Sequence, residues 1–157
     1  MKLRTLIPVL VLLFSPLLLP AQTKADSLKL ANTLKDLLNI CRTVNVTDPK
    51  TKEPGSFYKA APYMVYRGTD KARAWKSFAD YSKQEDKKAV DETCMRINET
   101  VNRDLKFRIT GYSTEKESEG TWHVLKVTYY DFKSKTFKKA AFAFLKIGDR
   151  FGLGDID

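Results

Sequence analysis

Two stretches of the chain repeat apolar residues at intervals of three and four, the spacing of one face of an α-helix. The first stretch covers residues 25–45, where Asp26 or Ser27 is suited to cap the helix start. The second begins with the capping-box pattern Ser82-Lys83-Gln84-Glu85 and is expected to run to about Arg103. Both are predicted to be amphipathic helices. Their apolar faces are Leu28, Ala31, Leu34, Leu37, Leu38, Cys41 and Val44 in the first, and Val90, Cys94, Ile97 and Val101 in the second.

The residues between these two helices indicate a loop and two shorter helices. Residues 46–56 contain prolines and a glycine and are predicted to form an exposed loop. Residues 57–66 are aromatic or small, so we expect a short or kinked helix that is interrupted by Pro62 and ends at Gly68. A further short helix is expected to begin at Thr69-Asp70, and it carries Ala72, Trp75, Phe78 and Ala79.

From Leu105 onward, apolar residues alternate with polar ones, which is the period of a half-buried β-strand. A first strand around residues 105–110 leads to a turn at 115–120, and a second strand covers residues 122–132. Lys133-Ser134-Lys135 forms the next turn. Residues 137–147 are apolar on both faces, so this third strand is expected inside the sheet. After Gly148-Asp149 a short final strand completes a predicted antiparallel meander.

Helical segments followed by consecutive strands define an α+β fold, with N-terminal helices packed on one face of an antiparallel sheet of about four strands. The segments RGTDKARAWKSFADYS, EDKKAVDETCMRIN and FLKIGDRFGLGDID resemble the nuclear transport factor 2-like superfamily, and more narrowly its small exported bacterial lumazine-binding-like members. The resemblance covers roughly residues 25–157. It implies that the antiparallel sheet is strongly curved, and that the helices and the curved sheet enclose a cone-shaped pocket. A cystatin-like fold, with one helix on a sheet, is the nearest alternative.

The first 21 residues are predicted to be a secretory signal peptide. Lys2 and Arg4 precede an uncharged apolar run from Leu6 to Leu19, which is shorter than the roughly 20 residues of a membrane span. Ala21 is a small residue suited to the cleavage point, which leaves residues 22–157 as a single α+β domain. An uncleaved anchor is the alternative. The signal and the resemblance together predict an exported protein, periplasmic or extracellular, of a bacterial cell envelope.

The charge balance has a different meaning in an exported protein. The chain has 28 Lys and Arg against 19 Asp and Glu, a formal net charge of +9. In the cytosol such a domain would suggest nucleic-acid binding, but export and the scatter of lysines among acids argue against a nucleic-acid partner. Weak attraction to anionic envelope lipid or polysaccharide stays open. One histidine and two cysteines are too few for a zinc site of four Cys and His ligands, so we expect no metal and no cofactor.

Cys41 and Cys94 lie on the apolar faces of the two long predicted helices. Export would place them in an oxidising compartment, where paired cysteines form disulfides. A bridge between them would close a long loop and stabilise the fold by about 4 kcal/mol if the effect is chain entropy. Two separate buried thiols are the alternative, because a free cysteine packs as a small apolar residue.

Groups suited to catalysis are sparse in this chain. His123 is the single histidine, on a strand face of mostly apolar residues. It can act as a general base at a pocket or pack as a structural residue bonded to backbone. Asp80, Asp131 and Tyr130 are residue types used by the isomerases and dehydratases of the resembled superfamily, but no catalytic motif assigns them that role. The chain has no G-x-S-x-G, Gly-rich phosphate loop or H-E-x-x-H, so we expect no enzyme.

Tyrosines are the best candidates for a binding pocket, because a tyrosine hydroxyl at a cavity mouth can find a hydrogen-bonding partner. The candidate pocket residues are Tyr58, Tyr63, Tyr66, Tyr81, His123 and Tyr129. They predict a non-catalytic binding or interaction module of the cell envelope, whose partner is a small apolar molecule or an envelope protein. The alternatives are a small-molecule isomerase or dehydratase that uses the same pocket, and a homodimer formed through the sheet.

The lining of the pocket distinguishes the binding module from the enzyme. A pocket lined by Tyr, Phe and aliphatic groups alone favours the binding module. His123 or an acidic residue inside a solvent-reachable pocket, hydrogen-bonded to a second polar side chain, favours the enzyme, because acid–base catalysis requires a titratable group held in position.

Overall fold

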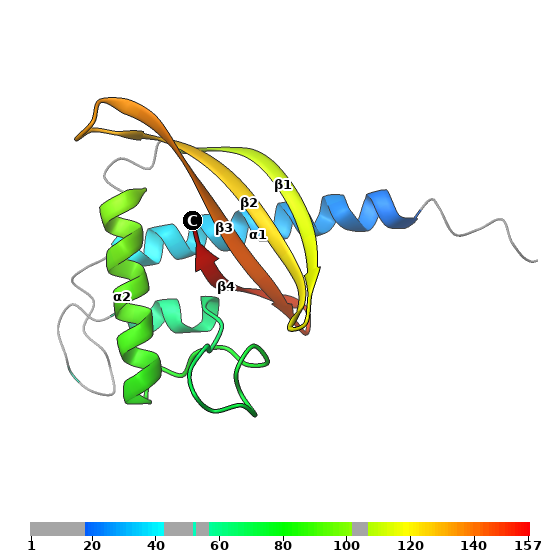
Figure 1. Cartoon of the computed structure of the whole chain (residues 1–157), viewed down its shortest axis with the longest axis vertical. Helices are drawn as coiled ribbons and strands as arrows, with labels where there is room; N and C mark the ends of the chain where they lie inside the picture. Colours follow the sequence, from blue (N-terminus) through cyan, green and yellow to red (C-terminus); the bar gives the residue numbers. More distant parts are fainter. Residues whose placement is uncertain (1–17, 43–51, 53–56, 102–106) are drawn as a thin grey trace, which may run out of the picture.

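The computed structural model describes residues 18–42, 52, 57–101 and 107–157, which form the predicted α+β arrangement (Figure 1). The helices are α1 (Leu18–Arg42), the 3₁₀ helix η1 (Tyr58–Tyr63) and α2 (Gln84–Thr100). The strands are β1 (Phe107–Glu117), β2 (Gly120–Asp131), β3 (Thr136–Ile147) and β4 (Arg150–Ile156). The loop predicted at 46–56 lies outside the described residues, apart from Lys52.

The four strands form one antiparallel sheet in the order β1-β2-β3-β4, which confirms the predicted meander and the interior position of β3. The turn predicted at 115–120 is shorter, Ser118-Glu119, because the ladder continues until Glu117 pairs with Gly120. A register shift between Ile109 and Gly111 is a β-bulge, which bends a strand. Figure 1 shows the three long strands as strongly curved ribbons, with α1 crossing one face of the sheet.

A large apolar core lies between α1, α2 and one face of the sheet. The stripe predicted for α2 is buried along its whole length, whereas the stripe predicted for α1 needs a correction. Leu28 does not belong to it, because its side chain is 66% exposed. Leu30, two positions later and therefore on another side of the helix, is buried instead. The buried stripe of α1 is Leu30, Leu34, Leu37, Leu38 and Cys41, and Val44 lies outside the described residues.

The start of α1 also differs from the prediction. The helix is already formed at Leu18, so Asp26 and Ser27 stand inside it and do not cap it. The Asp26 carboxylate instead forms an ion pair with Lys146 of β3 at 3.0 Å, which ties the helix to the sheet. The helix includes residues 18–21 of the predicted signal peptide, and cleavage after Ala21 stays a prediction. No helix among the described residues is both long and apolar enough to cross a membrane.

A disulfide joins the two long helices. The Cα atoms of Cys41 and Cys94 are 4.9 Å apart, and their sulfur atoms are at bonding distance. Asn98 of α2 supports the same junction, because its side-chain amide donates to the backbone carbonyl of Cys41 at 2.6 Å. Both cysteines are fully buried. The structure therefore has the predicted bridge rather than two separate thiols.

Residues 57–79 are less helical than their pattern predicted. The 3₁₀ helix η1 ends at Tyr63, and the chain is extended from Met64. The helix expected from Thr69 is wrong, because residues 71–76 form turns. The backbone N–H of Trp75 donates to the Tyr66 carbonyl and that of Tyr66 donates to the Ser77 carbonyl, and these bonds fold the chain back on itself. Residues 64–80 together are called the 64–80 segment below.

The capping box predicted at the start of α2 is wrong as well. The Ser82 hydroxyl donates to the Asp80 carboxylate at 2.7 Å, not to the helix backbone. Lys83 is the N-cap residue, and its side chain makes no capping bond. Glu85, the second half of the predicted box, binds the 64–80 segment instead. Tertiary partners therefore replace the local bonds that the pattern indicated.

The 64–80 segment passes the edge strand β4 and covers part of the sheet face opposite the core. At the edge, Met64 and Leu153 form a parallel bridge. On the face, Trp75 meets Trp122 of β2 edge-to-face, with ring centroids 5.6 Å apart. Gly154 permits this packing, since a Cβ at that position would lie 2.5 Å from the Trp122 ring. The segment thus forms a wall beside β4.

Candidate functional site

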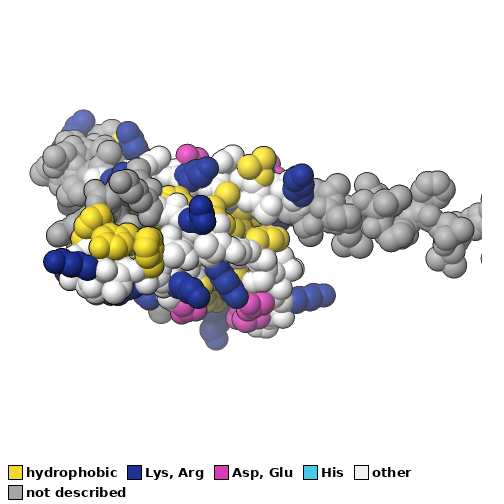
Figure 2. Space-filling model, turned by 90° about the horizontal axis from the view of Figure 1, so that it is seen from above, with side chains coloured by type: hydrophobic (Ala, Val, Ile, Leu, Met, Phe, Trp, Pro, Cys, Tyr) yellow, Lys and Arg dark blue, Asp and Glu magenta, His cyan; other side chains and the backbone are white. Residues whose placement is uncertain are grey.

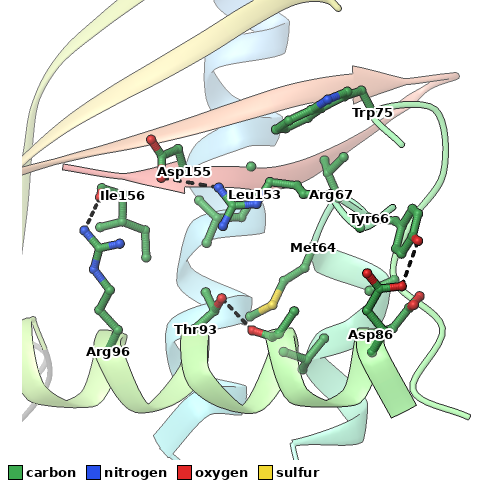
Figure 3. Close-up of a pocket in the computed structure, with 17 residues that line it drawn as sticks. Met64, Tyr66, Arg67, Trp75, Asp86, Thr93, Arg96, Leu153, Asp155 and Ile156 are labelled. Carbon is green, nitrogen blue, oxygen red and sulfur yellow. Dashed lines mark hydrogen bonds and ion pairs between the residues drawn. The ribbon is translucent and has the colours of Figure 1, made fainter. Parts of the chain in front are cut away.

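A cleft of about 500 Å³ opens between α2, β4 and the 64–80 segment (Figure 3). Its surface combines apolar side chains with a few charged ones. Figure 3 shows Tyr66 and Asp86 on one side of it and Arg96 with Ile156 on the other. The apolar wall residues include Ala89 and Val90 of α2, Leu153 and Ile156 of β4, and Met64 and Trp75 of the segment.

The first carboxylate at the start of α2, Glu85, holds the 64–80 segment in place. It accepts from the Tyr66 hydroxyl at 3.0 Å and from the Thr69 backbone N–H at 3.1 Å. The Tyr66 hydroxyl accepts in turn from the backbone N–H of Asp70 at 3.0 Å. Each carboxylate oxygen of Glu85 therefore has a donor from the segment.

The second carboxylate, Asp86, lies deeper and is only 1% exposed. It forms an ion pair with Arg73 at 2.5 Å and accepts from the Asp80 backbone N–H at 2.7 Å. The hydrogen bond to Asp86 raises the pKa of Arg73 above its ordinary value, so the guanidinium stays charged. The Arg73 guanidinium also lies over the Tyr66 ring, 3.9 Å from its centroid. One buried acid thus organises the wall of the cleft.

The opposite side of the cleft carries the cations Arg67 and Arg96. Arg67 pairs with Asp155 of β4 at 3.4 Å, and the two side chains are 45% and 52% exposed. Arg96 reaches from α2 to β4 and donates to the backbone carbonyl of Ile156 (Figure 3). An exposed ion pair contributes only about 0–1 kcal/mol. Arg67 can therefore exchange Asp155 for an anionic group of a ligand at little cost.

Trp75 lines the cleft with its backbone in an uncommon conformation. Its φ is +64°, in the left-handed region that costs a residue other than glycine roughly 1–2 kcal/mol. The backbone N–H of Trp75 donates to the Tyr66 carbonyl at 2.9 Å, and the ring contact with Trp122 fixes the side chain. Such outliers concentrate at functional sites, where the surrounding structure holds them.

Of the six predicted pocket residues, this cleft takes in Tyr66. Tyr58 and Tyr63 pack against the core, and Tyr129 is part of it. Tyr81 is buried, and its hydroxyl donates to the Asp91 carboxylate at 2.7 Å. The structure therefore does not bring these tyrosines together around the cleft. Tyr58 and Tyr63 pack toward the core from η1, Tyr81 from the turn before α2, and Tyr129 from β2.

The sixth candidate, His123, lies on the core face of the sheet and is 6% exposed. Its Nδ1 is 2.8 Å from the Tyr112 hydroxyl, and its ring meets Phe151 edge-to-face with centroids 4.9 Å apart. Burial lowers the pKa of His123 below its ordinary value of 6.5. The Tyr112 hydroxyl and the His123 ring nitrogen thus share a hydrogen bond. His123 is packed, but its hydrogen-bonding partner is a side chain and not the backbone of the sequence interpretation.

The charged residues of the cleft were not among the residues predicted from the sequence to line a pocket. Glu85 was expected only to cap α2, and Asp86 and Arg67 had no predicted role. The available signal was an acidic pair at a helix start that follows Tyr66, Arg67 and Arg73 in the chain. Among the acid–base types left open, Asp80 ends the segment, whereas Asp131 and Tyr130 lie in the β2–β3 hairpin, outside the cleft.

Comparisons with known proteins do not assign this chain to a family. No family model, no curated protein and no solved structure matches it. Membership of the nuclear transport factor 2-like superfamily therefore stays a prediction. Within the described part of the chain, no group of three or more His, Cys, Asp or Glu side chains is placed to hold a metal ion.

Proposed function

We propose that this chain is a non-catalytic, exported binding module of the cell envelope, and that the cleft holds a small, largely apolar ligand with one anionic group. The cleft is the observation that carries the proposal. Its volume of about 500 Å³ falls within the roughly 300–1,000 Å³ of small-molecule sites. The disulfide supports export, since such bonds persist in oxidising compartments.

The lining of the cleft defines the chemistry of the ligand. Met64, Val90 and Leu153 offer apolar surface to the body of the ligand. Arg67 stands on the cation side in a weak, exposed ion pair, so its guanidinium can bind a carboxylate, sulfonate or phosphate through two parallel hydrogen bonds. The cleft thus suits an amphipathic small molecule better than a fully polar one.

An isomerase or dehydratase is the second candidate, because the cleft meets the condition that the sequence analysis set for an enzyme. Glu85 and Asp86 are acids in a solvent-reachable cleft, and each is hydrogen-bonded to a second polar side chain. We place this candidate second because every one of these carboxylate oxygens already has a donor from the 64–80 segment. A general base needs a lone pair directed at the substrate.

The fluorescent probe 1-anilinonaphthalene-8-sulfonate, an apolar ring system with one sulfonate, tests the binding proposal. We expect saturable binding by the parent protein and its loss in Thr93→Trp, because Thr93 lines the cleft and an indole there fills it. The matched control Glu92→Trp keeps binding, since the neighbouring Glu92 side chain is 60% exposed. Arg67→Ala weakens binding by about tenfold through the loss of a charge-assisted hydrogen bond. Equal binding by parent and Thr93→Trp would refute the proposal.

Deuterium exchange distinguishes the two candidates without a known substrate. Small ketones and hydroxy acids are incubated with the protein in D₂O, and the incorporation of deuterium is followed by NMR. The binding module gives no incorporation above the rate in Glu85→Gln. Incorporation that disappears in Glu85→Gln, while that variant still binds the probe, would establish the enzyme instead.

A further inference from the structure

Two exposed aromatic side chains and one half-buried one lie together at the end of the β2–β3 hairpin, away from the cleft. Tyr130 and Phe137 face each other across the two strands, and Phe132 follows in the turn. The Tyr130 ring centroid is 4.8 Å from that of Phe132 and 5.4 Å from that of Phe137. Phe132 is 51% exposed and Phe137 is 75% exposed. Tyr130, Phe132 and Phe137 are called the hairpin-tip cluster below.

The hairpin-tip cluster is not part of the apolar core. Side chains alternate along a strand, so Tyr129 enters the core while Tyr130 points to the opposite face. Nearer the cleft, the same outer face is covered where Trp75 packs on Trp122. Figure 1 shows the hairpin projecting from the body of the molecule. Contiguous exposed apolar groups of this kind mark interaction surfaces.

Lysines surround the hairpin-tip cluster. Lys133 and Lys135 lie in the turn, Lys139 lies on the same strand face as Phe137, and all three are exposed. Among the described residues, no carboxylate pairs with any of these three lysines. Figure 2 views the molecule from above and shows a group of hydrophobic side chains with Lys and Arg side chains beside it.

The one acid of the hairpin is already neutralised. Asp131 pairs with Lys138 and accepts from the Ser134 hydroxyl, and these contacts hold the pKa of Asp131 well below its usual range. Lys133, Lys135 and Lys139 therefore give the hairpin tip a positive charge around an apolar centre.

We propose that the hairpin tip docks on an anionic membrane surface. The aromatic rings enter the headgroup region, where amphipathic and aromatic side chains are favoured, and the lysines bind lipid phosphates. A second copy of the chain fits this surface less well, because it would bring its own lysines against Lys133 and Lys135. Three aromatic side chains also bury far less than the roughly 800 Å² per partner of a stable interface.

Vesicle flotation tests this proposal. The exported protein is mixed with vesicles of phosphatidylcholine alone or with added phosphatidylglycerol, at low and high salt. We expect binding to the anionic vesicles only, and weaker binding at high salt, because salt screens charges beyond about 8–10 Å. Parent and variants carry the same N-terminus, so any contribution from residues 1–21 is common to all of them.

Two sets of substitutions locate the binding surface. Phe132→Ser with Phe137→Ser lowers vesicle affinity by about tenfold or more, since two aromatic side chains lose their burial. We expect at least about the same loss of vesicle affinity from the combined substitutions Lys133→Glu, Lys135→Glu and Lys139→Glu. The matched controls bind within about twofold of the parent, because they alter equally exposed groups elsewhere. They are Leu28→Ser with Met95→Ser, and Lys71→Glu, Lys76→Glu and Lys116→Glu together.

The outcomes decide between the membrane and other occupants. Near-ultraviolet circular dichroism verifies that each variant keeps its fold. Absence of binding to anionic vesicles overturns the proposal, and so does an equal loss in the matched lysine control, which would indicate general charge attraction. Light scattering that shows a dimer, dissociated by Phe132→Ser with Phe137→Ser, would assign the cluster to a second copy instead. Because none of these substitutions touches the cleft, the result is independent of the probe experiment.

Discussion

The α1–α2 junction and the 64–80 segment differ in what holds them in place. The junction is apolar and covalent, with buried leucines of α1 around the disulfide between Cys41 and Cys94. The segment is attached by polar groups: the carboxylates of Glu85 and Asp86, and a backbone hydrogen bond from Val65 to Leu153 at 2.9 Å. Apolar packing adjusts to small changes, whereas a buried polar network needs every member satisfied. The cleft therefore has two different walls. One is α2, which is joined covalently to α1, and the other is the 64–80 segment, whose attachment to α2 depends on polar groups.

This difference assigns the two parts different roles. The junction sets the stability of the whole domain, because unfolding must expose it. The 64–80 segment also buries Met64 and Val65. We expect its polar attachment to α2 to open locally without unfolding of the sheet. The predictions below test that division, from the largest expected effect to the smallest.

Removal of the disulfide gives the largest effect on stability. Cys41→Ala with Cys94→Ala releases a loop whose ends are 53 residues apart. We expect the free energy of unfolding to fall by about 4 kcal/mol, as estimated from the entropy of the released chain. Urea unfolding measures the change, and the parent in reducing agent serves as the control. A loss below about 1 kcal/mol would show that packing alone holds the junction.

Asp86→Ala tests the polar attachment of the segment. It removes the acceptor of the Asp80 backbone N–H and the partner of Arg73. We expect a loss of about 1–3 kcal/mol, with faster amide hydrogen exchange in residues 64–80 and unchanged exchange in α1. The control Glu92→Ala stays within about 0.5 kcal/mol of the parent. Equal acceleration of exchange in α1 would contradict a locally opening wall.

The backbone strain at Trp75 gives a smaller effect. At an ordinary position, glycine is less stable than alanine by about 0.5–1 kcal/mol. At the φ of +64° that Trp75 adopts, glycine is favoured over alanine. The variant Trp75→Gly is therefore expected to be more stable than Trp75→Ala. Lys76→Gly and Lys76→Ala, at the adjacent exposed position, provide the ordinary order for comparison. Thermal unfolding of the four variants checks the prediction, and the same order at both positions would rule out strain at Trp75.

The pH dependence contributed by His123 is the smallest effect. Burial lowers the pKa of His123 in the folded state below 6.5, so the unfolded chain binds a proton more readily. This part of the stability is complete above pH 6.5 and is lost as the pH falls toward the lowered value. His123→Gln removes this contribution, and the parent protein measured under the same conditions is the reference. Unfolding temperatures measured from neutral to mildly acidic pH with identical slopes for both would contradict the prediction.

The sequence predicted the parts of the fold that depend mainly on the burial of apolar residues. The α2 stripe and the β3 position follow from apolar periodicity, and both are confirmed. The Cys41–Cys94 bridge follows from two cysteines on apolar helix faces. One kind of failure occurs where a polar side chain has a choice of partners. Glu85 fits a local capping box, but Tyr66 and Thr69 take its carboxylate, so a pattern limited to four residues gives the wrong partner.

The candidate site was predictable only in part. Tyr66 was among the expected pocket residues, but the acids and arginines of the cleft were not. Five expected pocket residues lie outside the cleft, because an aromatic residue can enter a core or a cavity and its local sequence is the same in both cases. The cleft depends on where the 64–80 segment crosses β4, which no local spacing encodes.

The sequence by itself determined the two long helices, the antiparallel meander, the apolar stripe of α2 and the cysteine pair. Each of these depends on periodicity or residue type, which act over short distances along the chain. The tertiary structure alone decided that Asp86 meets Arg73, that Trp75 packs on Trp122, and that a cleft opens beside the edge strand. The strength of these contacts depends on the distance between the residues and on their burial. Both are set only when α2, β4 and the 64–80 segment have packed together.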